Sequence, residues 1–446
     1  MSHTLHHLGA EHNVTGSCRL LQVKGLNILV DCGIVQGSDH QRPFEQWPVF
    51  PDQLDYIFLT HAHLDHIGRL PEIIEQGFRG EIITTHGTKA LLDPMLHDAM
   101  GLHGITDKNI AQLQRRIEKL SWGFEYNTLF DLKNGVRFKL GRAGHILGSS
   151  FVRIQWGEPT YSIIFSGDLG PINTPILPDP DPPEPCNLLV LESTYGDRLH
   201  EERKGRINRL GAILTHALED GGKVFIPAFA LGRTQELLYE LDRLRTDPLL
   251  RKAYPLPADS QIPVVVDTPL GLRLTKLYKE MSQYWDKEAK DLLAHHDNPL
   301  DFKGLYRADK YRDHRKLIEM DGPAVIIAGS GMCTGGRIID HLLTGLSDPR
   351  NHILFVGYQA EGTPGRDIVQ FADKPTGYVY LDNKRCPIKA KVHVLDGYSA
   401  HADQQGLMDW VLSMGTKPDT IKLVHGDPQA QASLATKLRN SGYHVE

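Results

Sequence analysis

Three histidines and one aspartate within six positions constrain the fold of this chain more than any other feature. An apolar run at 56–59 predicts a short buried strand before them, and apolar residues at helical spacing from 67 to 74 predict a helix after them. The four side chains are those of His61, His63, Asp65 and His66. At a strand-to-helix turn such side chains can converge on one point. Imidazole and carboxylate are the usual ligands of a catalytic zinc, which keeps one coordination position open for water. Four such side chains are therefore too many for a single catalytic ion. The pattern therefore predicts two metal ions.

The composition is that of a globular protein with room for two or more domains. Of the 446 residues, 40% are hydrophobic and 23% are charged. The sequence has no apolar run of about 18 residues and no secretory signal, so we expect no membrane span. Five scattered cysteines favour a reducing cytoplasm and argue against a thiolate zinc site. Because the net charge is −6, local patches or metal ions must attract any nucleic acid.

Apolar periodicity divides the chain into three segments. Residues 1–196 alternate strands and helices and include a proline-rich connector at 178–185. Residues 197–385 alternate more regularly, as expected of an inserted, mostly parallel α/β domain. Its predicted helices cover 207–219, 233–245, 270–283 and 336–345, and its predicted strands cover 223–227, 262–266, 324–328 and 353–357. Residues 286–316 have no clear period. Strand, polar turn and helix return in residues 386–446.

Ligand-type side chains recur where predicted strands end. Besides the turn at 61–66, these positions are Asp31, His145, Asp168, His401 and His425. Counting ligands assigns one ion to His61, His63 and His145, and the other to Asp65, His66 and His425. Asp168 is the natural bridge, because a carboxylate has two oxygens to share. Asp31 is better suited to orient a ligand histidine by accepting its other ring N–H.

The order of these residues resembles the four motifs of the metallo-β-lactamase superfamily. Three further stretches resemble motifs A, B and C of its β-CASP branch of nucleic-acid nucleases, namely Glu192-Ser-Thr-Tyr-Gly, Ser399-Ala-His401 and Val424-His425-Gly. Similarity also runs through 229–236, 329–332 and 357–363, so the resemblance covers nearly the whole chain. It implies an α/β fold in which an αββα metallo-β-lactamase sandwich carries an inserted, mostly parallel β-CASP domain.

The resemblance implies a ribonuclease with two zinc ions, manganese being the alternative metal. Histidine at motif C, here His425, is typical of RNA-processing members. These include the endonuclease subunit of the pre-mRNA 3′-end cleavage machinery and shorter bacterial counterparts. We therefore expect a cytoplasmic hydrolase of RNA processing or decay, an endonuclease with 5′-exonuclease action left open. The family is also compatible with a homodimer. Its products would carry 5′-phosphate and 3′-hydroxyl ends.

Phosphodiester hydrolysis assigns further roles to residues of this site. Two ions would activate a hydroxide and bind the phosphoryl oxygens, and Asp65 could accept a proton besides binding metal. His401, oriented by Glu192, is the predicted general acid for the leaving oxygen. The alternatives for His401 are a further metal ligand or a helix cap. Ser399 could bind a phosphate oxygen or cap a helix.

Weaker patterns point to contacts with the RNA backbone. The turn Gly329-Ser330-Gly331 lies between a strand and a helix, and Arg233 begins a helix, so both could present N–H groups to phosphate. Such glycine-rich turns also arise for steric reasons alone. The basic segments at 312–316 and 384–391 are interpreted as solvated faces.

Two other functions fit parts of the pattern. A small-ester or thioester hydrolase could use the same metal site, but such a substrate needs no insertion like 197–385. A non-catalytic RNA-binding scaffold is the second alternative. Scaffolds of this kind typically lack ligands, whereas every ligand position is filled here.

Overall fold

The chain forms two compact units, each described by itself below. The computed structural model describes residues 3–35, 41–102, 104–201, 205–219, 221–256 and 262–446. Unit 1 comprises Met1–Leu199 and His401–Glu446, and unit 2 comprises His200–Ala400. The sequence placed the second boundary at 385/386. In the division into compact units, residues 386–400 are grouped with unit 2, where the strand at 391–394 pairs with the sheet.

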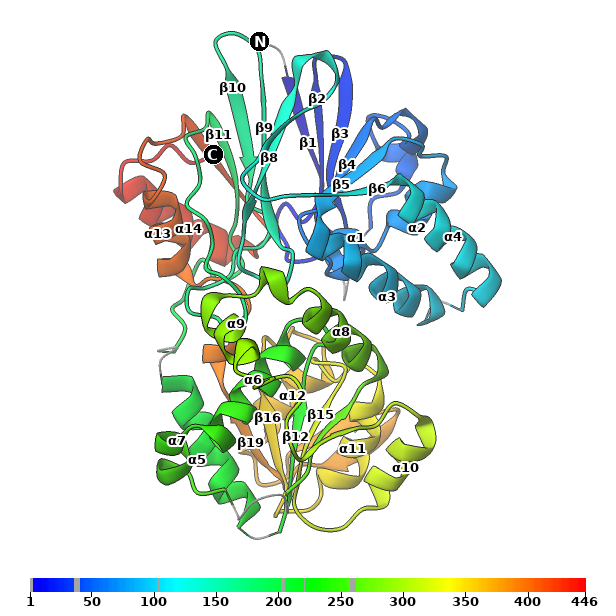
Figure 1. Ribbon diagram of the computed structural model, residues 1–446, viewed down its shortest axis with the longest axis vertical. Coiled ribbons are helices and arrows are strands. Elements are labelled where there is room, and N and C mark those ends of the chain that lie inside the picture. Colours follow the sequence, from blue (N-terminus) through cyan, green and yellow to red (C-terminus); the bar gives the residue numbers. More distant parts are fainter. Residues whose placement is uncertain (1–2, 36–40, 103, 202–204, 220, 257–261) are drawn as a thin grey trace. The chain divides into compact units, whose positions relative to one another are not determined.

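Unit 1 contains two six-stranded sheets packed face to face (Figure 1). The first, in spatial order, is β1 (His3–Gly9), β2 (Cys18–Val23), β3 (Leu26–Cys32), β4 (Tyr56–Phe58), β5 (Glu81–Thr85) and β6 (Ser121–Phe124). The second is β20 (Thr420–Val424), β11 (Leu188–Glu192), β10 (Tyr161–Phe165), β9 (Ser150–Trp156), β8 (Arg137–Arg142) and β7 (Leu129–Asp131). Apolar side chains of both sheets form the core between them. Phe58 and Phe138 meet there with ring centroids 5.1 Å apart.

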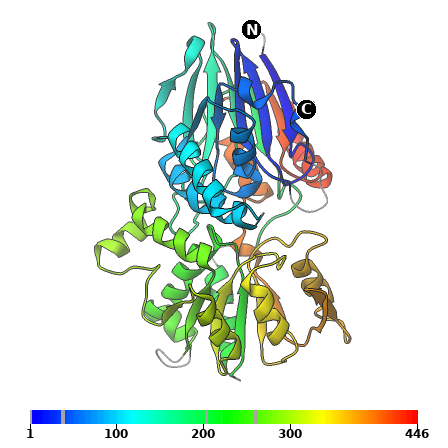
Figure 2. The same ribbon diagram turned by 90° about the vertical axis from the view of Figure 1, so that its right-hand side faces the viewer.

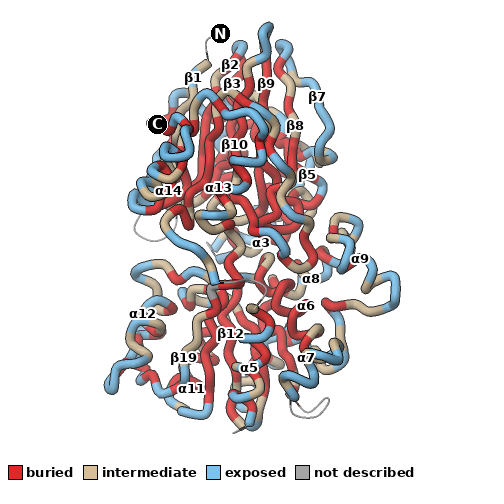
Figure 3. The backbone as a smooth tube through the Cα atoms, turned by 90° about the vertical axis from the view of Figure 1, so that its left-hand side faces the viewer, coloured by how far each residue is buried: buried red, intermediate tan, exposed pale blue. Residues whose placement is uncertain are grey.

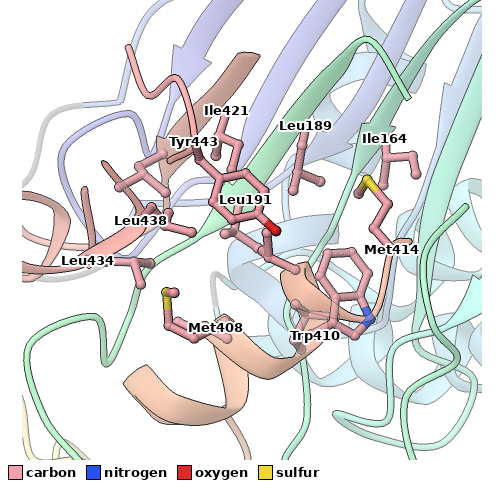
Figure 4. Packing of buried hydrophobic residues seen from close by; sticks show 14 of the residues in the cluster. Ile164, Leu189, Leu191, Met408, Trp410, Met414, Ile421, Leu434, Leu438 and Tyr443 are labelled. Atoms are coloured by element: carbon pink, nitrogen blue, oxygen red, sulfur yellow. The ribbon is translucent and has the colours of Figure 1, made fainter. Parts of the chain in front are cut away.

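Helices cover the outer face of each sheet, which confirms the αββα order predicted from the sequence. On the first sheet lie α1 (Leu64–Ile67), α2 (Leu70–Glu75), α3 (His86–Leu102) and α4 (Asp107–Leu120), seen from the side in Figure 2. On the second lie α13 (Gln404–Leu412) and α14 (Pro428–Asn440). Figure 4 shows Met408 and Trp410 of α13 and Leu434 of α14 packed against Leu191. The last 46 residues thus complete a core begun far earlier in the chain.

Strand direction decides where the polar turns of unit 1 gather. In the second sheet, β10, β11 and β20 are parallel, and β8 runs the same way because β9 is antiparallel to both β8 and β10. In the first sheet, β3 to β6 are parallel. Since the carboxyl ends of parallel strands meet at one edge, residues after β8, β10, β11 and β20 come together.

Unit 2 is a parallel α/β domain, as predicted. Its sheet, in spatial order, is β14 (Leu305–Arg307), β13 (Val264–Asp267), β15 (Ala324–Ala328), β12 (Lys223–Pro227), β16 (His352–Phe355) and β19 (Lys391–Val394), and every neighbouring pair is parallel. The helices are α5 (Arg206–Leu218), α6 (Arg233–Thr246), α7 (Pro248–Ala253), α8 (Pro269–Glu280), α9 (Lys287–Ala294), α10 (Tyr311–Glu319), α11 (Arg337–Gly345) and α12 (Pro364–Phe371). A separate hairpin joins β17 (Tyr378–Leu381) to β18 (Lys384–Pro387). The central strands are buried along their length (Figure 3).

A buried acid in α6 makes the stability of unit 2 depend on pH. Asp242 is buried, and its Oδ1 has no hydrogen-bond partner among the described residues. Burial, together with the charge of Asp297, raises the pKa of Asp242 to about 7, whereas an aspartate in an unfolded chain has a pKa of about 3.9. Ionisation therefore costs stability, a cost absent below about pH 4 and complete above about pH 7.

We expect Asp242→Asn to raise the melting temperature at pH 8 by a few degrees. About 1 kcal/mol corresponds to roughly 2–4 °C for a unit of this size, and the gain should disappear as the pH falls towards 4. Calorimetry across this range measures it. The exposed Asp373→Asn serves as a control and should change the melting temperature at neither pH. A gain for Asp242→Asn that persists at pH 4 would contradict the explanation.

No helix within the described ranges combines the length and apolar content needed to span a membrane.

Candidate metal centre

The turn between β4 and α1 positions the first four side chains. β4 is a buried strand that runs parallel to β3 and β5. The chain therefore leaves β4 at the edge where the carboxyl ends of these strands meet. His63 is still extended, with φ −71° and ψ 148°, and is the residue before α1. Asp65 and His66 follow in the first helical turn, where the His66 N–H donates to the His63 carbonyl at 2.9 Å. The helix begins at Leu64, so the histidines and the aspartate span the predicted strand-to-helix turn.

Four side chains form the first ligand group, His61, His63, His145 and Asp168. His63 Nδ1 lies 3.1 Å from both His61 Nε2 and His145 Nε2. Asp168 Oδ2 lies 3.5 Å from His61 Nε2 and 3.7 Å from His145 Nε2. His145 reaches this point from the turn after β8, where the Ser149 hydroxyl accepts its backbone N–H at 3.0 Å.

The second group consists of Asp65, His66 and His425. His66 Nε2 lies 3.3 Å from His425 Nε2, and Asp65 Oδ2 lies 3.6 Å from the same His425 atom. Asp168 Oδ2 is also 3.3 Å from His66 Nε2, so this one oxygen faces both groups. Its Oδ1 lies 3.6 Å from Nδ1 of His425, so both oxygens of Asp168 face side chains of the second group.

Asp31 is hydrogen-bonded to His66 of the second group. Its Oδ2 accepts the Nδ1–H of His66 at 2.7 Å, which directs Nε2 of that ring towards the second group. Thr60 fixes the carboxylate by donating its backbone N–H at 2.8 Å and its hydroxyl at 2.9 Å. Asp31 and His425 both have left-handed backbones, with φ 61° and 50°. Such conformations are rare for these residues and gather at functional sites.

The chemistry of these donors fits a divalent cation. Burial lowers the pKa of His61 well below its usual range and that of His63 to about 4, so both rings are neutral at neutral pH. Ring nitrogens of His61 and His145 both lie 3.1 Å from Nδ1 of His63, and a single neutral ring nitrogen cannot serve both contacts as donor and acceptor, whereas a cation among the three could accept a lone pair from each. For Asp65, burial alone would raise the pKa, but His66 and His425 lower it to about 2. The first group thus offers neutral imidazole nitrogen from His61 and His63, whereas the carboxylates around His66 raise the pKa of that ring, and a cation in the second group would displace its proton.

His401 lies beside the two groups and is held by Glu192. Its Nδ1 is 3.3 Å from Glu192 Oε1 and 4.0 Å from Asp168 Oδ2. The Glu192 carboxylate is fully buried and also accepts the backbone N–H groups of Leu169 and Thr194, which fixes its orientation. Burial alone would lower the pKa of His401, but Glu192 and Asp168 raise it to about 9. This imidazole therefore carries a proton at neutral pH.

Several supporting residues gave no signal in the sequence. Thr60 holds Asp31, and the Thr194 hydroxyl lies 3.1 Å from His425 Nδ1. Arg19 lines a cavity of about 20 Å³ together with Asp168, room for one water molecule. The Arg19 guanidinium donates to the carbonyls of Gly9, Cys18 and Ala10. Threonine and arginine match no metal-ligand pattern, so only the folded arrangement identifies them.

The predicted RNA-binding residues belong to unit 2. Ser399 is buried and follows Tyr398, whose hydroxyl donates to Glu240 at 3.4 Å. The backbone of the turn 329–331 is hydrogen-bonded within the same loop, where the Ser330 N–H donates to the Gly335 carbonyl at 3.0 Å. Arg233 is the first residue of α6, as predicted, and its side chain is engaged within the unit. It is only 6% exposed and forms an ion pair with Glu236.

A third cluster of histidine and aspartate lies in unit 2, at Asp267, His314 and His341. Asp267 Oδ2 accepts a ring N–H from each histidine at 2.6 Å, and Oδ1 accepts from Arg337 at 2.8 Å. These distances are those of charge-assisted hydrogen bonds rather than the 3.1–3.7 Å separations of the first ligand group. The cluster is therefore a hydrogen-bond network that joins β13, α10 and α11.

Comparison with known proteins matches both the fold and this site. The model of the metallo-beta-lactamase superfamily matches residues 14–227, the Beta-Casp domain matches 234–368, and the Zn-dependent metallo-hydrolase RNA specificity domain matches 385–446. The chain is 36% identical to ribonuclease TTHA0252 of Thermus thermophilus over 98% of its own length and 96% of that protein. It is 31% identical to transcription termination factor FttA of Methanocaldococcus jannaschii, covering 97% of this chain and 68% of that one.

A more distant relative and one solved structure complete the comparison. Cleavage and polyadenylation specificity factor 73 of Drosophila melanogaster is 29% identical over 97% of this chain, which spans 61% of that protein. A crystal structure of a protein of unknown function from Enterococcus faecalis V583 has a TM-score of 0.58 at 12% identity. It covers 100% of this chain and 98% of that one, and shows the fold alone.

Two sheets between helices, with a divalent-metal centre at their polar edge, define a metallo-hydrolase fold of the metallo-β-lactamase superfamily. Within that superfamily the chain belongs to the β-CASP family.

Proposed function

We propose that the chain is a metal-dependent ribonuclease that hydrolyses RNA phosphodiester bonds and leaves 5′-phosphate and 3′-hydroxyl ends. The observation that carries the proposal is the convergence of seven ligand-type side chains into two groups that meet at Asp168, from turns separated by up to 364 positions between His61 and His425 (425 − 61). The proposed ligands of one ion are His61, His63 and His145, those of the other are Asp65, His66 and His425, and Asp168 is shared.

The residues of the chain then have separate tasks. Two bound ions, zinc by donor type and manganese as the alternative, would lower the pKa of a water molecule and neutralise phosphoryl oxygens. Asp65 accepts a proton, while Asp31 and Thr60 keep His66 in the tautomer that presents Nε2. His401 faces the same centre as a charged imidazole and donates its proton to the leaving 3′-oxygen.

RNA is favoured as the substrate by two independent features. Three relatives carry names from RNA chemistry or transcription, the first of them a ribonuclease of nearly the same length. His425 fills the motif C position with the imidazole typical of RNA-processing members and lies 3.3 Å from His66. A small-ester hydrolase would use the same metal groups but gives no role to the 201 residues of unit 2 (400 − 200 + 1).

The remaining assignments stay predictions. Ser399 and the turn 329–331 are candidate RNA contacts of unit 2. A cytoplasmic location is consistent with five cysteines that are all buried and unpaired as disulfides. Homodimer assembly is open to measurement by light scattering.

Metal removal tests the proposal directly. Dialysis against a chelator should reduce RNA cleavage at least about 100-fold, because the ions supply both the nucleophile and the charge neutralisation. Added Zn²⁺ or Mn²⁺ should restore it. RNA labelled at either end, with a 5′-phosphate or a 5′-cap, separates mononucleotide release from internal cutting. Undiminished cleavage by the metal-free protein, or turnover of a lactone or thioester without cleavage of RNA, would overturn the proposal.

A further inference from the structure

The hairpin of β17 and β18 in unit 2 has two chemically different faces. Val379, Leu381, Cys386 and Ile388 point inwards and belong to the apolar core of the unit. On the outer face, Tyr378 is 41% and Tyr380 is 58% exposed. Cross-strand pairing sets Tyr380 opposite Arg385, and the Arg385 guanidinium lies over the Tyr378 ring, 4.1 Å from its centroid. Two accessible aromatic rings are therefore held beside a cation.

Residues 374–391, here called the basic hairpin, carry an unusual density of unpaired positive charge. The segment holds Lys374, Lys384, Arg385, Lys389 and Lys391 against one acid, Asp382, a net charge of +4 (5 − 1) in a chain of net charge −6. All five cations are exposed, and none has a carboxylate within 4.0 Å in the described part of the chain.

Some exposed cations elsewhere in the same unit are paired with a carboxylate, so that their charge is compensated locally. Lys276 pairs with Glu280, Lys287 with Asp291, Arg307 with Asp301, Arg315 with Glu319 and Arg350 with Asp348. A solvated face of ordinary composition mixes charges of both signs. The basic hairpin does not, so its positive potential is available to an anionic partner.

We propose that the basic hairpin is a binding surface for single-stranded RNA, made of residues that are not part of the metal centre. The choice of RNA among polyanions rests on the proposed function. Tyr378 and Tyr380 offer ring faces on which unpaired bases of any sequence stack, and the lysines and Arg385 contact the phosphates between them. A protein partner fits less well, because lysine is depleted in the cores of protein interfaces. A duplex would leave the rings unused, since its bases are already stacked. The surface replaces the interpretation of 384–391 as a solvated face.

Anisotropy of a fluorescein-labelled, unstructured 20-nucleotide RNA tests this surface with the full chain in EDTA, so that the RNA stays intact. Tyr378→Ala/Tyr380→Ala should weaken binding at least about tenfold, since one stacked base contributes about 1–3 kcal/mol. Lys384→Ala/Arg385→Ala should weaken binding and lower the slope of log K against log salt by about 1.4, because each phosphate contact contributes about 0.7 on single strands. The tyrosine effect should be absent with a duplex of the same sequence.

Matched variants of unit 2 serve as controls. Tyr306→Ala/Tyr311→Ala removes two tyrosines that are 55% and 63% exposed. Lys276→Ala/Lys287→Ala removes two cations that are already paired. Both should bind within twofold of the wild type. If the two hairpin variants also bind RNA within twofold of the wild type, the proposal is wrong. Because binding is measured without cleavage, a failure of the ribonuclease assignment would appear only in the separate assay of the metallated wild type.

Discussion

His425→Ala is expected to reduce the metal content from two ions per chain to one and to lower RNA cleavage more than about 100-fold. His425 Nε2 lies 3.3 Å from His66 Nε2 and 3.6 Å from Asp65 Oδ2, so it closes the second ligand group. Without it that group keeps only two ligands of its own. Loss of an outer-shell partner already costs about 10–100-fold in metal affinity or activity, and loss of a ligand should cost more. Elemental analysis and cleavage of labelled RNA measure the two effects.

His444→Ala is the matched control for this variant. His444 lies in the same C-terminal segment, is exposed, and has its Nδ1 3.2 Å from the hydroxyl of Thr420. Both ions and full activity should remain after its removal. Two ions and wild-type cleavage in His425→Ala would refute the division of ligands between the groups.

The grouping of these ligands could be predicted because it depends on local spacing and strand direction. His61, His63, Asp65 and His66 lie within one turn whose geometry follows from a strand ending and a helix starting at Leu64. His145, Asp168 and His425 follow strands that run in one direction in one sheet, so their approach is a consequence of topology. The strands predicted at 223–227 and 324–328 coincide with β12 and β15, because fully buried parallel strands are continuous apolar runs.

Elements without such runs were missed. β1 is a half-exposed edge strand rich in histidine, so its apolar alternation is weak. The segment at 286–316, which showed no period, contains α9, β14 and most of α10. The only buried residue of α10 is His314, and its burial is made possible by hydrogen bonds to Asp267 and Asp340. Those partners are distant in sequence, and no periodicity reveals them.

Details of polar contacts were equally beyond the sequence. The turn after β10 directs Asp168 Oδ2 towards both ligand groups and sets Oδ1 3.6 Å from His425 Nδ1. The Arg233 side chain pairs with Glu236, because both lie in the first turn of α6, three residues apart. In both cases the residue type was informative, whereas the direction of the side chain depended on its neighbours in the fold.

His401→Ala is expected to retain both ions but to slow RNA cleavage by about 10²–10⁴-fold, the usual contribution of a general acid. His401 Nδ1 faces Glu192 at 3.3 Å, whereas its distance to Asp168 Oδ2 is 4.0 Å. The carboxylate of Glu192 therefore holds the proton on this ring, and the ligand groups of both ions are complete without it. Metal analysis of the variant should give the wild-type value.

A substrate with a better leaving group separates acid catalysis from metal binding. The p-nitrophenolate of bis(p-nitrophenyl) phosphate leaves without being protonated, so His401→Ala should hydrolyse this ester at close to the wild-type rate while RNA cleavage falls. Glu192→Gln should show the same selectivity to a smaller degree, because an amide orients the imidazole but does not stabilise its charge. Loss of metal in His401→Ala would instead identify a ligand. Only the ribose oxygen needs a proton to leave. Equal losses of rate on RNA and on bis(p-nitrophenyl) phosphate would therefore show that His401 is not the general acid.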